Sequence, residues 1–157
     1  MEYLVTTLLW LCALGCGLLG GVYFAFSAFI MKALEGVGHS GTVAMNSINA
    51  MILRSWFMPM FVATTLGALA LAVLGVLELG GARGKLMLAG GVLYVAGMFL
   101  VTMFFNVPLN NALVAVSNES RTGAAIWKDY VRRWTRWNHV RTASCVAASA
   151  LFIAALR

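Results

Sequence analysis

The sequence predicts an all-α, polytopic membrane protein, in which four transmembrane helices form a bundle with amphipathic helical connections after the first and third helices. Apolar residues make up 62% of the 157-residue chain and charged residues only 10%, against about 25% charged residues in soluble domains. The mean hydropathy is +0.89. Too little polar surface is therefore available to cover a soluble fold, and the length allows a single domain, residues 1–157.

The spans follow from four apolar runs, since a helix needs about 20 apolar residues to cross the hydrocarbon core. They cover approximately residues 4–30, 57–79, 86–105 and 140–156. The runs lack the alternation of barrel strands, and four segments cannot close a barrel, so helices are expected. Between the second and third runs, the polar stretch GGARGK at residues 80–85 predicts a tight turn between antiparallel neighbours.

The two longer connections predict further helices. In the first, residues 42–56 read TVAMNSINAMILRSW, which places Met45, Ile48 and Ile52 on one flank of a helix and Asn46 and Asn49 on another. The second, residues 106–138, is too long for a turn. Its proline at position 108 suits a first helical turn, and a helix that begins near residue 123 can continue into the fourth span.

Small residues predict how the spans pack. Gly17 and Gly21 form a GxxxG motif in the first span, and Gly90 and Gly97 lie in the third. Small side chains let helix backbones approach closely where lipid is as apolar as the helices themselves. We therefore expect these glycines at helix contacts.

The distribution of lysine and arginine predicts the orientation of the chain. Two lie in the 32–55 connection and six in the 106–141 connection, whereas the remaining three lie in the 80–85 turn and at the C-terminus. Because basic residues favour the cytoplasmic side, both long connections are expected in the cytoplasm and both termini outside, in the inner membrane of the cell. This topology also accounts for the net charge of +6 without a nucleic-acid partner.

By this topology, polar side chains from four segments meet on one side of the membrane, near bilayer depth, where unpartnered polar groups are costly. The last connection contributes a seam on one helix face, with steps of 3, 4, 4 and 3: Trp127, Tyr130, Trp134, Asn138 and Arg141. The other segments contribute Tyr23 and Ser27, then Asn46, Asn49 and Arg54, and then Asn106, Asn110 and Asn111. Their convergence predicts a site.

Structural roles compete with this interpretation. Four residues fall off the seam and are typical of anchors at the membrane interface: Arg132, Arg133, Arg136 and Trp137. Asn106 and Asn110 are alternatively helix caps around the proline. Arg141 is alternatively a side chain that extends to the interface. His139 has the chemistry of a base near neutral pH and equally that of an interfacial polar residue. Helix packing is the alternative for Tyr23 and Ser27.

No motif for nucleotide, zinc or acyl-enzyme chemistry occurs in the sequence, and we predict no cofactor. His39 and His139 leave a haem or metal site as an alternative, although no carboxylate or thiolate stands at ligand spacing to them. Cys12, Cys16 and Cys145 lie in apolar runs without a CxxC motif and are expected as packing residues. The expected partners are the lipid bilayer and a hydrophobic small molecule, and a homo-oligomer is left open.

Four stretches occur in an order that resembles the anthrone oxygenase-like family of small four-helix membrane proteins: GGVYFAFSAFIMKAL, MNSINAMI, FNVPLNNAL and RWTRWNHVRT. The most specific parts are N-x-P-x-N at residues 106–110 and W-x-x-W-N-x-x-R at residues 134–141. The family is named after members that use O₂ to oxidise an anthrone methylene to a carbonyl, without a conventional cofactor. The resemblance implies an oxygenase for a hydrophobic aromatic substrate.

The resemblance also implies roles for the residues of the site. An anthrone methylene is acidic because its carbanion is an aromatic phenolate, and such an anion can react directly with O₂. The protein would supply a base, donors for the oxyanion and an apolar slot. The implied base is His139; the implied donors are Asn106, Asn110, Asn138 and Arg141; and the implied walls are Trp134, Trp127 and Tyr23. Further substrate contacts are expected from Tyr130, Ser27 and Asn49. The alternative function is a non-catalytic membrane protein that binds lipid, a quinone or a partner subunit.

Overall fold

The computed structural model describes residues 2–115 and 121–157. It confirms the all-α class, since the described ranges contain helices and no strand. Within these ranges, seven α-helices and three π-helical turns follow one another as α1 (Glu2–Ala25), η1 (Phe26–Ile30), α2 (Met31–Gly36), α3 (His39–Ile52), α4 (Phe57–Leu77), α5 (Ala82–Tyr94), η2 (Val95–Leu100), η3 (Thr102–Asn106), α6 (Val107–Val114) and α7 (Arg121–Ala154).

Three helical segments in the described ranges are long and apolar enough to cross a membrane: Glu2–Gly36, Phe57–Leu77 and Ala82–Val114. The first and third extend well past the predicted limits of 4–30 and 86–105. They do so because the residues that flank η1, η2 and η3 keep right-handed helical dihedral angles, so each helix continues through its π-helical turn. The apolar runs of the sequence therefore predicted the central part of each helix, but not its continuation to Gly36 or to Val114.

The predicted fourth span lies within α7, a continuous helix that contains residues 140–154 of it. As expected from the sequence, the helix starts near residue 123 and runs straight on. Unlike the other three segments, α7 is not among those apolar enough to span. Asn138, His139 and Arg141 interrupt its apolar stretch. A fourth crossing therefore stays a prediction.

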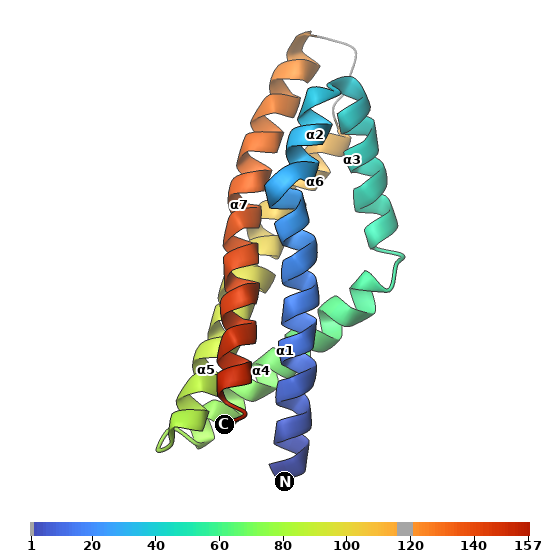
Figure 1. Cartoon of the computed structure of the whole chain (residues 1–157). Coiled ribbons are helices and arrows are strands. Elements are labelled where there is room, and N and C mark those ends of the chain that lie inside the picture. The colour runs from blue at the N-terminus through green and yellow to red at the C-terminus, as the bar shows by residue number, and fades with distance from the viewer. Residues whose placement is uncertain (1, 116–120) are drawn as a thin grey trace.

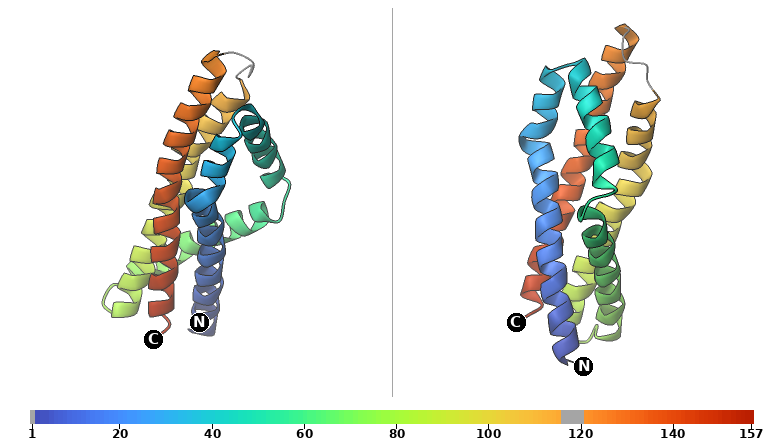
Figure 2. Two further views of the ribbon diagram at one scale, coloured as in Figure 1. Left: turned by 45° about the horizontal axis from the view of Figure 1, so that its top comes forward. Right: turned by 90° about the vertical axis from the view of Figure 1, so that its right-hand side faces the viewer.

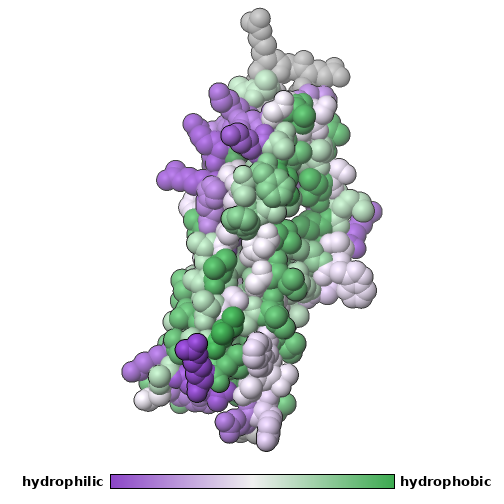
Figure 3. All heavy atoms as spheres, in the orientation of Figure 1, coloured by the Kyte–Doolittle hydropathy of each residue, from purple (hydrophilic) through white to green (hydrophobic). Residues whose placement is uncertain are grey.

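The long helices pack in a closed arrangement. α1 lies along α7, α7 along α5, α5 along α4, and α4 against α1. Their shared core contains fully buried side chains from every one of them, including Leu9, Leu71, Met87 and Phe152. Around this core, many large apolar side chains face outward, among them Leu11, Leu14, Leu18, Leu66 and Val146. Figure 3 shows the resulting apolar band between more polar ends.

Glycines allow the closest helix contacts, although not at the positions of the GxxxG motif. A methyl group on Gly91 would lie 2.5 Å from Ala68 O and 2.7 Å from Ala72 Cβ, and one on Gly97 would collide with Ser144. By contrast, no atom lies within 4 Å of such a group on Gly21. The expectation for Gly90 and Gly97 is confirmed, since a methyl group on Gly90 would meet the Phe152 ring. The expectation for Gly21 is wrong because that glycine faces outward.

The connection helices form a second packed region beyond the spans, the helical head. α2, α3, α6 and the first half of α7 contact one another there, around the buried side chains of Met31, Met45, Leu113, Trp127, Tyr130, Val131 and Trp134. Both termini and the α4–α5 turn lie at the opposite end of the molecule (Figure 1). Figure 2 shows the same division from two further directions.

Candidate functional site

A cavity of about 330 Å³ lies where the helical head meets the long helices. This volume is within the usual range of small-molecule sites, about 300–1,000 Å³. α1, η1, α3, α4, η3, α6 and α7 all contribute to its wall. In Figure 1, α4 slants away from α1 towards the turn that joins it to α3. The cavity therefore spans the junction between apolar and polar parts of the fold.

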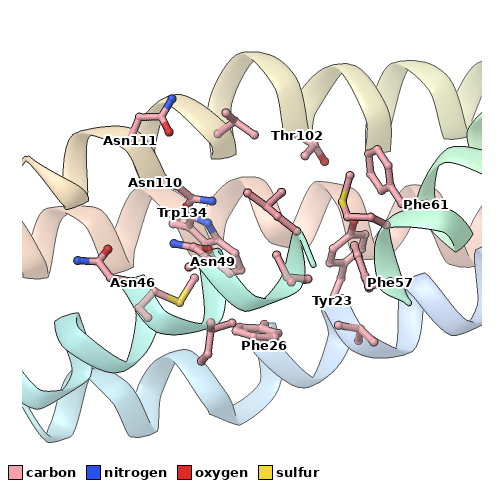
Figure 4. Close-up of a pocket in the computed structure, with 18 of the residues that line it drawn as sticks. Tyr23, Phe26, Asn46, Asn49, Phe57, Phe61, Thr102, Asn110, Asn111 and Trp134 are labelled. Carbon is pink, nitrogen blue, oxygen red and sulfur yellow. The ribbon is translucent and has the colours of Figure 1, made fainter. Parts of the chain in front are cut away.

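The two ends of the cavity differ in chemistry (Figure 4). Aromatic rings dominate one end, where Tyr23 meets Phe57 edge to face at 6.1 Å and Phe57 stacks on Phe61 at 6.2 Å. We call this the aromatic end. Four amide side chains gather at the other, the amide end: Asn46, Asn49, Asn110 and Asn111. The cavity therefore has an apolar, aromatic end and a polar, uncharged end.

The predicted seam of α7 is confirmed as one buried face. All five of its residues have exposed fractions of 5% or less: Trp127, Tyr130, Trp134, Asn138 and Arg141. The off-seam residues Arg132 and Arg133 are exposed and pair with Asp129 on the surface, as expected of anchors. Only Trp134 and Arg141 of the seam line the cavity. The other three support the wall from behind.

Arg141 is the most unusual residue of the cavity, because it is a cation buried to 95% of its surface without an acidic partner. Its guanidinium carbon lies 4.2 Å from the centre of the Tyr23 ring and 4.9 Å from that of Trp134, and these contacts favour a cation. Both ion pairs found in the described part of the chain involve Asp129, on the outer surface. Because a guanidinium keeps its proton in proteins, an unbalanced positive charge faces the cavity.

Asn138 fixes the position of Arg141. Its Nδ2 donates to Tyr23 O at 2.6 Å and to Ser27 Oγ at 2.7 Å, and its Oδ1 accepts from Arg141 Nη2 at 2.6 Å. A second, longer contact joins Arg141 Nη1 to Thr102 Oγ1 at 3.5 Å. With its hydrogen-bonding capacity used inside the protein, Asn138 positions other groups. Like Ser27, it lies outside the cavity wall.

The N-x-P-x-N residues also divide between structure and site. Asn106 is buried away from the cavity and donates from Nδ2 to Trp134 O at 3.2 Å, which fastens η3 to α7. Asn110 lines the cavity, and its Oδ1 accepts a 2.9 Å hydrogen bond from the Tyr130 hydroxyl. Burial raises the pKa of Tyr130 above its ordinary value, so the hydroxyl stays protonated and acts as a donor. Tyr130 in turn stacks on Trp127 at 5.5 Å.

The structure separates His139 from the site. Its side chain is exposed and borders an outer groove with Lys32, Glu35 and Arg136. The physical reason is helix geometry: adjacent residues point about 100° apart, so the burial of Asn138 turns its neighbour outward. The expectation that His139 reaches the substrate as a base is therefore not supported by its position. In the described ranges, no group of three or more histidine, cysteine or acidic side chains could hold a metal ion.

Sequence reasoning missed several cavity residues. Thr102, Phe57 and Phe61 line the cavity but were treated as ordinary parts of membrane spans. Thr102 carried a usable signal, a hydroxyl within a long apolar run. The two phenylalanines carried none, because their contact with Tyr23 depends on how α4 crosses α1. Asn46 and Asn111 belonged to the predicted polar cluster, and the structure places both at the amide end.

Together, the fold and the cavity define a helical protein of the integral membrane class with an internal cavity of small-molecule size. The family model for anthrone oxygenase matches residues 48–151, which is about two thirds of the chain. The chain therefore belongs to the anthrone oxygenase family. The matched region contains the whole α7 seam and the N-x-P-x-N motif, whereas Tyr23 and η1 precede it. No curated protein and no solved structure matches the chain.

Proposed function

We propose that the protein is a membrane-embedded oxygenase that uses O₂ to oxidise an anthrone-like aromatic compound at an acidic ring methylene. One observation carries this proposal: a buried guanidinium without an acidic partner faces an aromatic-lined cavity in a member of this family. A charge in such surroundings stabilises an anion far more strongly than it would in water. The anion that the proposed reaction forms is the phenolate of the deprotonated anthrone.

The proposed reaction balances without a further reactant. Loss of a proton from the methylene gives the aromatic phenolate, which donates electrons to O₂. One oxygen atom ends as the new ring carbonyl, the other leaves as water with both methylene hydrogens, and the anthrone becomes an anthraquinone. The ring is oxidised by four electrons, and O₂ is reduced by four. The chain's own task is to bind the ring, stabilise the phenolate and keep bulk water away.

Arg141 serves as the oxyanion donor, and Thr102 lies at its side of the cavity. Trp134, Tyr23 and Phe57 form the walls for a flat ring. Among the described residues of the wall there is no carboxylate and no histidine. We therefore assign water or hydroxide as the acceptor of the first proton. Arg141 lowers the free energy of this proton transfer because it stabilises the phenolate that forms.

The proposed setting is a four-span protein of the inner membrane, with the helical head in the cytoplasm and both termini outside. The charge distribution supports this orientation, as the two connections that build the head carry most of the basic residues. In this setting the aromatic end of the cavity lies at membrane depth and the amide end near the interface. An apolar aromatic compound that accumulates in the bilayer would reach the cavity directly.

The test measures O₂ uptake and anthraquinone formation by purified protein with anthrone as substrate. We expect Arg141→Met to lower kcat/KM by about 10²- to 10³-fold, as removal of an oxyanion donor does in other enzymes. Two changes on the outer face of the same helix, Arg136→Met and His139→Gln, serve as controls and should keep the parent rate. Equal rates for the parent and Arg141→Met, or no protein-dependent turnover, would contradict the proposal.

The second candidate function is binding without catalysis. The cavity itself favours it as much as it favours an enzyme, because a buried cation and an aromatic wall also suit a quinone or another acidic aromatic ligand. This function predicts that anthraquinone binds and that Arg141→Met weakens binding, while O₂ consumption with anthrone stays at the rate measured without protein.

A further inference from the structure

The amide end contains hydrogen-bonding atoms that the protein itself leaves unused. Asn46 Oδ1 and Asn49 Nδ2 are both buried, and neither makes a hydrogen bond of good geometry with a described residue, although Asn49 faces the Tyr130 hydroxyl. Both side chains belong to the cavity wall and lie three positions apart on α3. Buried polar atoms normally find a partner, because leaving one unpaired costs about 1–3 kcal/mol. Their presence in a cavity wall points to a partner in the ligand.

The chemistry of the two atoms narrows the ligand group. Asn46 Oδ1 accepts a hydrogen bond and Asn49 Nδ2 donates one. A hydroxyl group both donates and accepts, whereas a carbonyl or an ether only accepts and a methyl group does neither. No charged side chain accompanies them among the described residues of the amide end. Among these four groups, only a hydroxyl matches both atoms, and it does so without a charge.

The position of the amide end determines where on the ligand this hydroxyl lies. Figure 4 places Asn46 and Asn49 at the opposite end of the cavity from Thr102, Phe57 and Phe61. The Arg141 guanidinium lies beside Thr102, and its carbon is closer to the Tyr23 ring, at 4.2 Å, than to the Trp134 ring, at 4.9 Å, which places it towards the aromatic end. A ligand oxygen held by Arg141 is thus separated from the amide end by the body of the ligand.

We infer that Asn46 and Asn49 determine substrate specificity by binding a neutral hydroxyl group on the end of the aromatic substrate that lies away from the oxygen bound by Arg141. This inference rests on the proposed function for the identity of the ring system, and it adds the polar substituent that the cavity selects. It also gives the ligand one orientation, because a reversed ligand would place its apolar edge against unpaired amides.

The test uses two stable compounds that differ by one hydroxyl: 2-(hydroxymethyl)anthraquinone and 2-methylanthraquinone. Both are neutral and neither consumes O₂, so binding to the full chain in lipid nanodiscs is measured by quenching of tryptophan fluorescence. We expect the parent to bind the hydroxymethyl compound about three- to tenfold more tightly, the range of one net hydrogen bond. Asn46→Leu and Asn49→Leu should each reduce this ratio towards one, with binding of the methyl compound kept.

The control is Ser47→Leu, which places the same new side chain on the exposed face of α3 and should keep the parent ratio. Circular dichroism shows which variants are folded. If one asparagine variant fails to fold, the binding ratio of the other is sufficient to test the inference. Equal binding of the two compounds by the parent overturns the inference, as does a preference kept in the folded leucine variants or lost in Ser47→Leu. If the protein prefers the hydroxymethyl compound but does not oxidise anthrone, only the proposed oxidation is contradicted. If it oxidises anthrone but shows no such preference, only the inferred specificity is contradicted.

Discussion

Asn138 shows how a single polar residue in an apolar setting can organise a site without lining it. Its amide binds the backbone of α1 at Tyr23, the hydroxyl of Ser27 and the guanidinium of Arg141. The arginine is then held against two aromatic rings. A buried cation without an acidic partner would otherwise turn towards water, because the desolvation of a charge costs several kcal/mol. Asn138 is therefore a positioning residue for the cation.

Replacing Asn138 by leucine tests this role. Asn138→Leu removes three hydrogen bonds while it keeps the branching of the side chain, and it leaves the Arg141 guanidinium without its shortest contact. We expect the free energy of unfolding to fall by about 1–3 kcal/mol, since hydrogen bonds between membrane helices contribute less than one would expect from an apolar medium. Denaturant unfolding in detergent measures it. The exposed neighbour provides the control, as His139→Leu should stay within about 0.5 kcal/mol of the parent; similar unfolding of both variants would refute the role.

The neighbours Asn138 and His139 show what the sequence can predict about single residues. Helical periodicity placed Trp134, Asn138 and Arg141 on one face, and their burial confirms it. The resemblance to the family implied His139 as the base of the same site, whereas the structure leaves its side chain exposed on the outer face of α7. The aromatic residues of α4 could not be assigned to the same site, because no local pattern reports which distant helix a side chain meets.

At the scale of elements, π-helical turns shape the cavity. Turns η1 and η3 adjoin it, through Phe26 and through Thr102 and Met103. A π-helical turn contains an extra residue and changes the partners of nearby carbonyl groups, and such turns are frequent at functional sites. Tyr23 O, shortly before η1, accepts a hydrogen bond from Asn138 Nδ2, and Met98 O accepts a hydrogen bond from Thr102 Oγ1 at 2.7 Å. The apolar runs of the sequence predicted helices here without any sign of these turns.

Gly91 provides a test of the contact between α4 and α5. Gly91→Ala would place a methyl group 2.5 Å from Ala68 O, a backbone atom that can move only if α4 moves. We expect a loss of about 1–3 kcal/mol in the free energy of unfolding, the usual cost of overpacking. Gly21→Ala makes the same chemical change where no atom lies within 4 Å; it should not lower the free energy of unfolding, and the higher helix propensity of alanine can raise it by up to about 1 kcal/mol. Equal stability of the two variants would show that α4 and α5 are not in this contact.

At the scale of the whole molecule, the positions of the chain ends favour the predicted fourth crossing. Both termini and the α4–α5 turn lie at one end, and the helical head lies at the other (Figure 1). If α1, α4 and α5 cross the membrane, α7 must return the chain through it to bring the C-terminus back beside the N-terminus. Hydropathy alone finds three spanning helices, because the polar residues of the site reduce the apolar character of α7.

Reporter fusions distinguish three crossings from four. In a bacterial host, alkaline phosphatase is active only outside the inner membrane and green fluorescent protein fluoresces only inside. We expect active phosphatase when it is joined after Arg157 or inserted at Gly81, and fluorescence when the second reporter is inserted at Gly38, between α2 and α3. The insertion at Gly81 fixes the side of the α4–α5 turn and serves as the reference for the C-terminal fusion. If a fluorescent protein joined after Arg157 fluoresces while phosphatase at Gly81 is active, α7 does not cross the membrane. If fluorescence is found at Gly81 and Arg157 and phosphatase activity at Gly38, the orientation is inverted.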